Sequence, residues 1–266
     1  MKVCEIRDEY NQKCVIGYLF YFPTDDIFSV EISDDAGEED VPLFLSSFVR
    51  KNQRTVDPQW SSRWVESRIV PRDRQNLGTV LRDNGLDGYD RFRLLMLGEG
   101  RCAQDDCALV PVQERRLPAW LRGRMEKKLS FVAALPGWDL LCIFRDGSIR
   151  RVNIRERAER ERGMQILVAR PRRFFEARVL AGGVGVTWGD DTFLSGTFLY
   201  HAGKKLPLTR EELRTITGHY VLDTADVCRE LHCSRQYVSQ LVKKNVLTEL
   251  KEGGHTRLYT RDELPL

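Results

Sequence analysis

The strongest constraint on the fold of this chain is a pair of short apolar runs near its start. The run VIGYLFYF covers residues 15–22, the run IFSVEI covers residues 27–32, and a PTDD segment separates them. Both runs are rich in β-branched and aromatic residues, which favour strands, whereas proline and aspartate favour turns. The sequence therefore predicts an antiparallel β-hairpin over residues 15–32.

Helices are expected after this hairpin. The segments DVPLFLSSFVRK (40–51) and PQWSSRWVESRIV (58–70) have apolar residues at intervals of three and four, which is typical of helices. A shorter helix is expected from Asp73, as its cap, to Asn84-Gly85, with its apolar side chains facing the core: Leu77, Val80 and Leu81. The apolar run at residues 92–97 predicts a buried strand.

The middle of the chain has the pattern of further strands. DLLCIF and SIRRVNI flank Arg145-Asp146-Gly147, and an Asp-Gly pair tolerates the positive φ angles of a tight hairpin turn. The segments RRFFEARVL (172–180) and GVGVTW (183–188) are expected as strands around a Gly182-Gly183 turn. A polar connector with a short helix from Thr209 then leads to the last segment.

The last segment predicts two short helices joined by a turn. Asp223 is a candidate N-cap with Asp226 three residues later, and Ser234 is a candidate cap for the second helix. Apolar residues at helical spacing, Val238, Leu241 and Val242, are expected to face inward. The remaining polar side chains are then expected on the outer surface: Arg235, Gln236, Tyr237, Gln240, Lys243 and Lys244.

These outer side chains have the chemistry of a DNA-reading helix. Arginine binds guanine and glutamine binds adenine through two hydrogen bonds, whereas lysine neutralises phosphates. The following stretch VLTELKEGGHTRLYT predicts a wing hairpin with His255, Thr256 and Arg257 near its tip, and Thr260 with Glu263 predicts a further capping box. The alternative is that the second helix is merely one arm of a packed helical hairpin.

Composition supports a folded protein rather than a membrane or disulfide-rich one. Hydrophobic residues make up 42% and charged residues 30% of 266 residues, and no apolar run approaches the roughly 20 residues that span a bilayer. Seven cysteines without a CxxC pair indicate reduced thiols and no structural zinc. We expect a cytoplasmic protein, with no membrane partner, no metal and no cofactor.

Charge is unevenly distributed along the chain. Residues 1–56 contain eleven acidic against six basic side chains, whereas residues 114–178 contain seventeen Lys and Arg against eight acids. The basic tract is either a solvated surface or a patch that faces phosphates or an acidic partner. Residues 221–266 contain seven basic and seven acidic side chains, so tight DNA binding would require a homodimer or help from the basic tract.

The sequence gives little support for a catalytic function. Cys102 lies near Asp105 and Asp106, but a cysteine nucleophile needs a base to form its thiolate, and no histidine precedes His201. The sequence also lacks the phosphate-binding loop, dinucleotide-binding, zinc-protease and serine-hydrolase motifs. We therefore expect no catalytic residues and interpret residues 100–110 as a polar turn between two strands.

Three segments resemble known families. LDTADVCRELHCSRQYVSQLVKKNVL and TRLYTRDEL resemble the MerR/excisionase-type winged helix-turn-helix family, although His232 stands where the family usually has glycine. In that family the second helix enters the major groove and the wing touches the DNA backbone or minor groove. By position, this implies base or backbone contacts for five residues of the second helix and three of the wing: Arg235, Gln236, Tyr237, Gln240, Lys243, His255, Thr256 and Arg257. Ser234 and Lys244, at the two ends of that helix, complete the candidate DNA-binding residues.

The other two resemblances concern fold. Residues 129–200 are similar to a bacterial family of small α+β domains of unknown function, through residues such as Trp138, Asp146-Gly147, Phe174-Phe175 and Trp188. Members of that family sometimes sit beside toxin–antitoxin-like partners. GYLFYF…FSVEI and RQNLGTVLRDNGL resemble the N-terminal subdomain of the HipA toxin kinases, but no kinase core follows, so phosphoryl transfer is not implied.

Together these features predict an α+β multidomain protein. Two small α+β domains, at residues 1–113 and 129–201, are expected before a winged helix-turn-helix domain at residues 221–266. The favoured function is sequence-specific binding of double-stranded DNA, as a transcriptional regulator whose first two domains sense a signal or bind a protein. The alternative is an antitoxin-like interaction or inhibitor protein, directed for example at a phage or host complex, that docks onto a protein partner.

Overall fold

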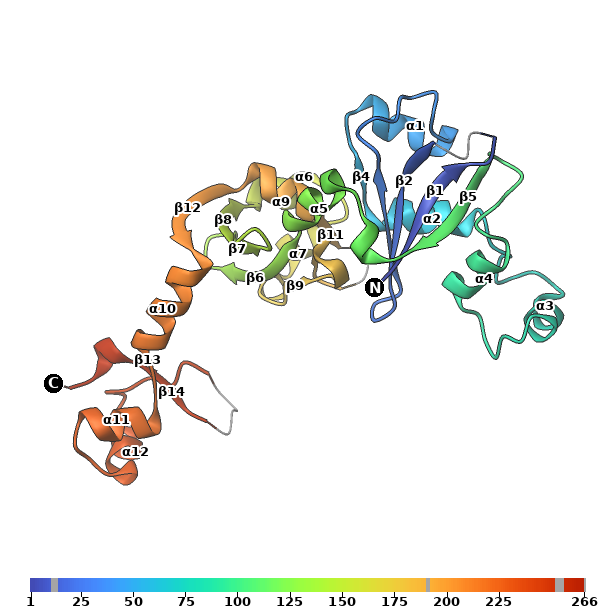
Figure 1. The fold of residues 1–266 in the computed structure, drawn as a ribbon. Coiled ribbons are helices and arrows are strands. Elements are labelled where there is room, and N and C mark those ends of the chain that lie inside the picture. Colours follow the sequence, from blue (N-terminus) through green and yellow to red (C-terminus); the bar gives the residue numbers. More distant parts are fainter. Residues whose placement is uncertain (11–13, 190–191, 252–255, 266) are drawn as a thin grey trace. The chain divides into compact units, whose positions relative to one another are not determined.

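The structure, a computed structural model, describes residues 1–10, 14–189, 192–251 and 256–265. The chain forms two compact units. Unit 1 comprises residues 1–146 and 150–205, and unit 2 comprises residues 206–266 with residues 147–149. The fold is mixed α+β, as expected, and several small sheets alternate with short helices (Figure 1).

Unit 1 begins with a five-stranded antiparallel sheet of order β4-β3-β2-β1-β5. Its strands are β1 (Lys2–Asp8), β2 (Val15–Phe22), β3 (Ile27–Ile32), β4 (Thr55–Val56) and β5 (Cys107–Val112). The predicted hairpin is confirmed, because β2 pairs with β3 from Gly17 opposite Ile32 to Phe22 opposite Ile27. The two strands are buried along almost their whole length, as their apolar sequences require.

Two of the expected helices pack onto this sheet. They are α1 (Leu43–Arg50) and α2 (Pro58–Glu66), which contact each other through the rings of Phe48 and Trp60. Asp57 caps α2 by accepting a hydrogen bond from the Trp60 N–H, and Trp64 is fully buried below it. Proline at the first position of α2 suits a helix start, since its missing N–H has no helical partner.

The next segment differs from the sequence prediction in one element. Residues 92–97 form a helix, α4 (Arg91–Leu97), where a strand was expected. Asp90 starts this helix by accepting a hydrogen bond from the Arg93 N–H, and Phe92, Leu94 and Leu95 are buried. A short continuous apolar run has no periodicity that separates a buried strand from a buried helix.

The preceding helix, α3 (Leu77–Asp83), forms as expected, but it begins three residues later than predicted. Its N-cap residue is Asn76 instead of Asp73, and none of its side chains is buried. Leu81 packs partly against the core. The predicted end of the helix is confirmed, because Gly85 adopts a φ of 63°, a left-handed conformation that glycine accepts without strain.

The second half of unit 1 contains two further sheets. After the short helix η1 (Glu114–Arg116) and α5 (Ala119–Glu126), the chain forms a four-stranded sheet of order β12-β8-β7-β6. Its strands are β6 (Leu129–Leu135), β7 (Asp139–Phe144), β8 (Ser148–Asn153) and β12 (Lys204–Thr209); the first two residues of β8 and the last four of β12 belong to unit 2. The predicted turn between β7 and β8 forms, and Gly147 there has a φ of 80°.

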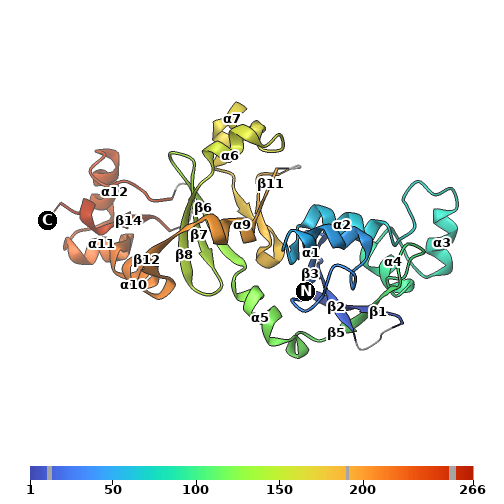
Figure 2. The ribbon, with the colours of Figure 1, turned by 90° about the horizontal axis from the view of Figure 1, so that it is seen from above.

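A three-stranded sheet and several short helices complete unit 1. The sheet has the order β11-β10-β9, from β9 (Arg178–Val179), β10 (Gly185–Thr187) and β11 (Phe193–Ser195), with the short helix η2 (Ala181–Gly183) after β9. Of the strand predicted at residues 172–180, only β9 forms, because Pro171 starts a helix, α8 (Pro171–Phe174). The other helices are α6 (Arg155–Arg160) and α7 (Gln165–Ala169), which contact each other, and α9 (Gly196–Ala202) (Figure 2).

Apolar and charged contacts join the two halves of unit 1, whose segments 1–113 and 129–201 were expected as separate domains. Phe20 and Phe22 of β2 share a buried cluster with Leu121 of α5 and Val184. Glu31 of β3 is fully buried and pairs with Lys128. Both halves therefore belong to one compact unit.

Unit 2 has its own small core. It contains α10 (Arg210–Tyr220), β13 (Val221–Asp223), α11 (Thr224–Glu230), α12 (Arg235–Lys243), β14 (Leu258–Thr260) and the short helix η3 (Arg261–Glu263). The predicted helix after Thr209 is confirmed as α10, which starts with a capping box. β13 and β14 pair antiparallel. Their buried side chains Leu222 and Tyr259 pack with residues of α11 and α12: Val227, Val238 and Leu241.

Within the described residues, no helix combines the length and the apolar character needed to cross a bilayer.

Candidate nucleic-acid interface

Local sequence signals position the two helices α11 and α12. Asp223 accepts hydrogen bonds from the N–H groups of Ala225 and Asp226, and the Asp226 carboxylate accepts one from the Asp223 N–H, so the predicted capping box is confirmed. His232, in the turn, has a φ of 49°. Ser234 accepts from the Tyr237 N–H and starts α12, as expected.

Helix α12 has an apolar side and a polar side. Val238 and Leu241 are 1% and 6% exposed, and Val242 packs partly against the same core. Every residue predicted for the outer surface of α12 and its cap is exposed: Ser234, Arg235, Gln236, Tyr237, Gln240, Lys243 and Lys244. Gln236, Gln240 and Lys243 follow one another at intervals of four and three, so they form one line along the exposed side.

Arg235 lies at the edge of a groove. The groove has a volume of about 370 Å³. It is lined by residues of α12, of the start of α11 and of the segment that contains β14: Arg235, Ser239, Asp223, Thr224, Ala225, Thr256, Arg257 and Tyr259. The structure thus brings one predicted residue of the helix together with two predicted residues of the wing. The hydroxyl of Tyr259 is buried there and forms no hydrogen bond to any described residue.

Among the described residues of the predicted wing hairpin, only the second arm forms a strand, β14. Residues 248–251 are not a strand, and β14 pairs with β13 instead. A 2.9 Å hydrogen bond from the Leu250 N–H to the Leu258 carbonyl connects the two arms. Thr256 and Arg257 are exposed, whereas His255 lies outside the described residues.

The predicted capping box of Thr260 and Glu263 does not form. Thr260 precedes η3, but its side chain makes no capping hydrogen bond. The Glu263 carboxylate instead accepts a 2.7 Å hydrogen bond from the Thr248 N–H. A contact between segments distant in the sequence has replaced the local one that the motif predicted.

Basic side chains of unit 2 differ in whether a carboxylate neutralises them. Arg229, Arg257 and Arg261 form ion pairs with Asp226, Glu249 and Glu230. Arg235, Lys243 and Lys244 have no such partner among the described residues. Arg235 also occupies the first turn of α12, which contains no acidic residue to complement the positive end of the helix dipole. Among the described residues, Arg214 of α10 and Lys251 also form no ion pair, so α12 and the residue after it contribute three of the unpaired basic side chains of unit 2.

The Cys102 region forms a turn, but it lies between the helix α4 and the strand β5 and not between two strands as predicted. Cys102 and Asp105 form an isolated bridge before β5. The side chain of Arg68, which is 1% exposed, donates a 2.9 Å hydrogen bond to the Cys102 Sγ and pairs with Asp105. In the described part of the chain, no group of three or more His, Cys, Asp or Glu side chains could hold a metal ion.

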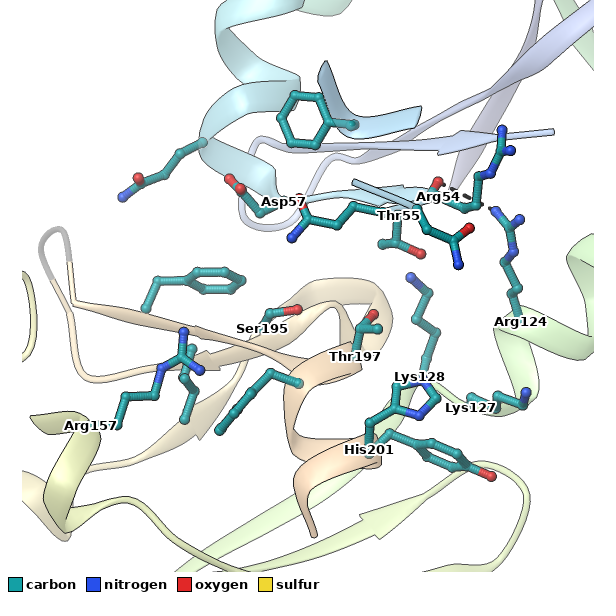
Figure 3. Close-up of a pocket in the computed structure, with 18 of the residues that line it drawn as sticks. Arg54, Thr55, Asp57, Arg124, Lys127, Lys128, Arg157, Ser195, Thr197 and His201 are labelled. Carbon is teal, nitrogen blue, oxygen red and sulfur yellow. Dashed lines mark hydrogen bonds between the residues drawn. The ribbon is translucent and has the colours of Figure 1, made fainter. Parts of the chain in front are cut away.

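Sequence reasoning missed one further candidate site, a cavity of about 950 Å³ in unit 1 (Figure 3). Its lining includes Arg54, Lys127 and Thr197, which come from three distant segments of the sequence. No motif connects these residues, so only the folded structure reveals the site.

Models of protein families, curated proteins and solved structures were compared with this chain, and none of them matches it.

Proposed function

We propose that this protein binds double-stranded DNA in a sequence-specific manner through unit 2, as a transcriptional regulator of the winged helix-turn-helix type. The observation that carries the proposal is the exposed polar side of α12, which is held by an apolar underside and by the Ser234 cap. A helix of this size fits into the major groove of DNA. The groove beside Arg235 would then take a stretch of the DNA backbone.

The side chains of α12 divide into two chemical classes. Gln236 and Gln240 are suited to adenine and Arg235 to guanine, since each can form two hydrogen bonds with the edge of its base. Lys243 and Lys244 lie at the end of the helix and are suited to phosphates. Because these cations lack carboxylate partners among the described residues, they remain available for DNA although unit 2 has a balanced total charge.

The test starts from a selection of DNA fragments that the purified full-length chain retains, followed by gel-shift titration of the selected site and of unrelated DNA. Arg235→Ala and Gln240→Ala are expected to lose about 1–3 kcal/mol of discrimination between the two DNAs. Lys243→Ala is expected to weaken binding to both DNAs alike and to reduce the slope of log K against log salt by about 1.

The matched control is Arg214→Ala, which removes an exposed arginine of α10 in the same unit. This variant is expected to bind like the unmodified protein. Unchanged titrations for Arg235→Ala, Gln240→Ala and Lys243→Ala would refute DNA binding through α12.

A second candidate function is binding of a protein partner through the same unit. It is favoured by exposed apolar side chains near α12: Tyr237, Val246 and Leu250 are 46%, 41% and 52% exposed. Exposed apolar side chains are enriched at protein interfaces. A stoichiometric partner that survives nuclease treatment and is lost on Leu250→Ser would favour this function over DNA binding.

A further inference from the structure

The helix α10 of unit 2 leaves most of its apolar side exposed. It has eleven residues and buries none of them, whereas every other described helix of at least eight residues buries at least one. Leu213 is partly buried, and Ile216 and Tyr220 are 51% and 41% exposed. The packing that normally stabilises a helix is therefore incomplete for α10.

The three apolar side chains of α10 form one stripe along the helix. Leu213, Ile216 and Tyr220 follow one another at intervals of three and four residues, so they lie on the same face. A helix of this length is only marginally stable in water by itself, and packing of an apolar face supplies most helical stability in proteins. Covering Ile216 and Tyr220 would therefore stabilise α10.

The charged side chains beside the stripe match a second copy of the same helix. Glu212 and His219 are seven residues apart, which is close to two full turns, so they lie on one flank of the stripe near its opposite ends. In an antiparallel pair of identical helices each flank faces its own counterpart, so Glu212 of each copy lies near His219 of the other. This arrangement also sets the positive end of each helix dipole beside the negative end of the other.

Helix α10 is joined firmly to the helices that carry the proposed DNA-reading surface. It leads directly into β13 (Figure 1). Arg261 donates a 2.8 Å hydrogen bond to the His219 carbonyl in the last turn of α10, and its guanidinium also pairs with Glu230 of α11. Two copies that pair through α10 would thus hold their two α12 helices in a fixed twofold relation.

We propose that α10 is the interface through which two copies of this chain form an antiparallel twofold dimer. Its use rests on the proposed DNA binding, because one nine-residue reading helix contacts few base pairs, and a twofold dimer reads two half-sites. The helix is only about 16 Å long, so the dimer is weak in free solution. It becomes stable on DNA, where binding of one copy raises the effective concentration of the other.

The experiment is sedimentation equilibrium of the full chain, without DNA, from about 1 to about 200 μM. A monomer–dimer equilibrium is expected, with a dissociation constant on the order of 10–100 μM. Ile216→Asp is expected to raise this constant at least about tenfold, because it buries a charge in the apolar contact. Thr215→Asp is the matched control: it places the same side chain on another, exposed side of α10 and is expected to leave dimerisation unchanged.

Two substitutions at His219, whose side chain is exposed, test the antiparallel self-pairing. His219→Lys is expected to tighten the dimer by about threefold and His219→Glu to weaken it by a similar factor, since the dimer contains two pairs with Glu212. A contact with any other partner would not respond in this way.

Two results would overturn the dimer: a chain that stays monomeric at all these concentrations, or an Ile216→Asp variant that dimerises like the unmodified chain. These results are separable from the test of DNA binding. A monomeric chain that still binds the selected DNA refutes only the dimer, whereas a dimer that binds no DNA refutes only the proposed function.

Discussion

At the scale of single residues, Glu31 is the side chain whose burial depends most on its charged partners. It is fully buried, accepts a 2.7 Å hydrogen bond from the Thr55 hydroxyl and pairs with Lys128 and Arg124. Moving these charges out of water costs several kcal/mol per ion, and their mutual attraction offsets this cost only while all partners are present. Removal of one partner therefore leaves an uncompensated buried charge.

Glu31→Gln is accordingly expected to lower the free energy of unfolding of unit 1 by about 3–5 kcal/mol, measured by urea denaturation. Glu159→Gln is the matched control, because Glu159 pairs with Arg155 on the exposed surface of α6. It is expected to cost less than about 0.5 kcal/mol. Equal losses for the two variants would show that the buried cluster contributes no more than a surface pair.

At the scale of elements, side-chain caps decide where several helices begin. Asp57, Asp90, Thr209, Asp223 and Ser234 all accept hydrogen bonds from N–H groups of the first turn. These N–H groups have no partner within the helix, so each cap satisfies a donor that would otherwise need water. For α12 the cap also fixes the first residue of the proposed DNA-reading surface.

Ser234→Ala is expected to destabilise unit 2 by about 1 kcal/mol and to speed amide hydrogen exchange at the start of α12. Ser195→Ala is the matched control, because Ser195 occupies the N-cap position of α9 without making a capping hydrogen bond. It is expected to change exchange in α9 very little. If the two variants behave alike, the Ser234 hydrogen bond does not hold the start of α12.

Local signals account for what the sequence could predict among the elements. The hairpin of β2 and β3 and the helix starts at Thr209, Asp223 and Ser234 depend on neighbouring residues, and the sequence contains those residues in order. The helix α4 could not be recognised, because its apolar run suits both a buried strand and a buried helix and Asp90 was not identified as its cap. The capping box at Thr260 failed because Glu263 bonds to Thr248, a partner that only tertiary structure supplies.

At the scale of the whole molecule, packing explains part of the uneven charge distribution. Arg124 and Lys128 belong to the basic tract, and the structure pairs them with Glu31 and Asp34 of the acidic first segment. Asp25 of that segment also accepts a 2.9 Å hydrogen bond from the Ala181 N–H. The sequence shows the two charge excesses but not that they meet, and for the same reason it could not reveal the cavity.

Buried thiols predict how the stability of the molecule depends on pH. Burial raises the pKa of Cys107 and Cys142 to about 12, and burial, partly opposed by Lys2, raises that of Cys4 to about 11, from an ordinary value of 9.0. Between these values and 9.0 the unfolded chain releases protons that the folded chain retains. The stability that these thiols contribute is therefore complete below pH 9.0 and is lost as pH rises toward about 12.

We expect the free energy of unfolding of unit 1, measured by urea denaturation in the presence of a reductant, to fall as pH rises from about 9 to about 11. The expected decline is up to about 1.4 kcal/mol per pH unit for each thiol, and the urea midpoint falls with it. Cys142→Ala removes one of the three thiols and is expected to make this decline shallower, whatever its effect at neutral pH. A midpoint that stays constant over this range would contradict the prediction.

The ion cluster at Glu31 also constrains how the protein is made. A nascent chain that has left the ribosome only as far as β5 contains all five strands of the first sheet. It still lacks Arg124 and Lys128, so the Glu31 carboxylate then has neither of the cations with which it pairs in the complete chain. Synthesis must therefore pass residue 128 before this ion cluster can form, and the first sheet gains its last charged contacts only from the segment that follows it.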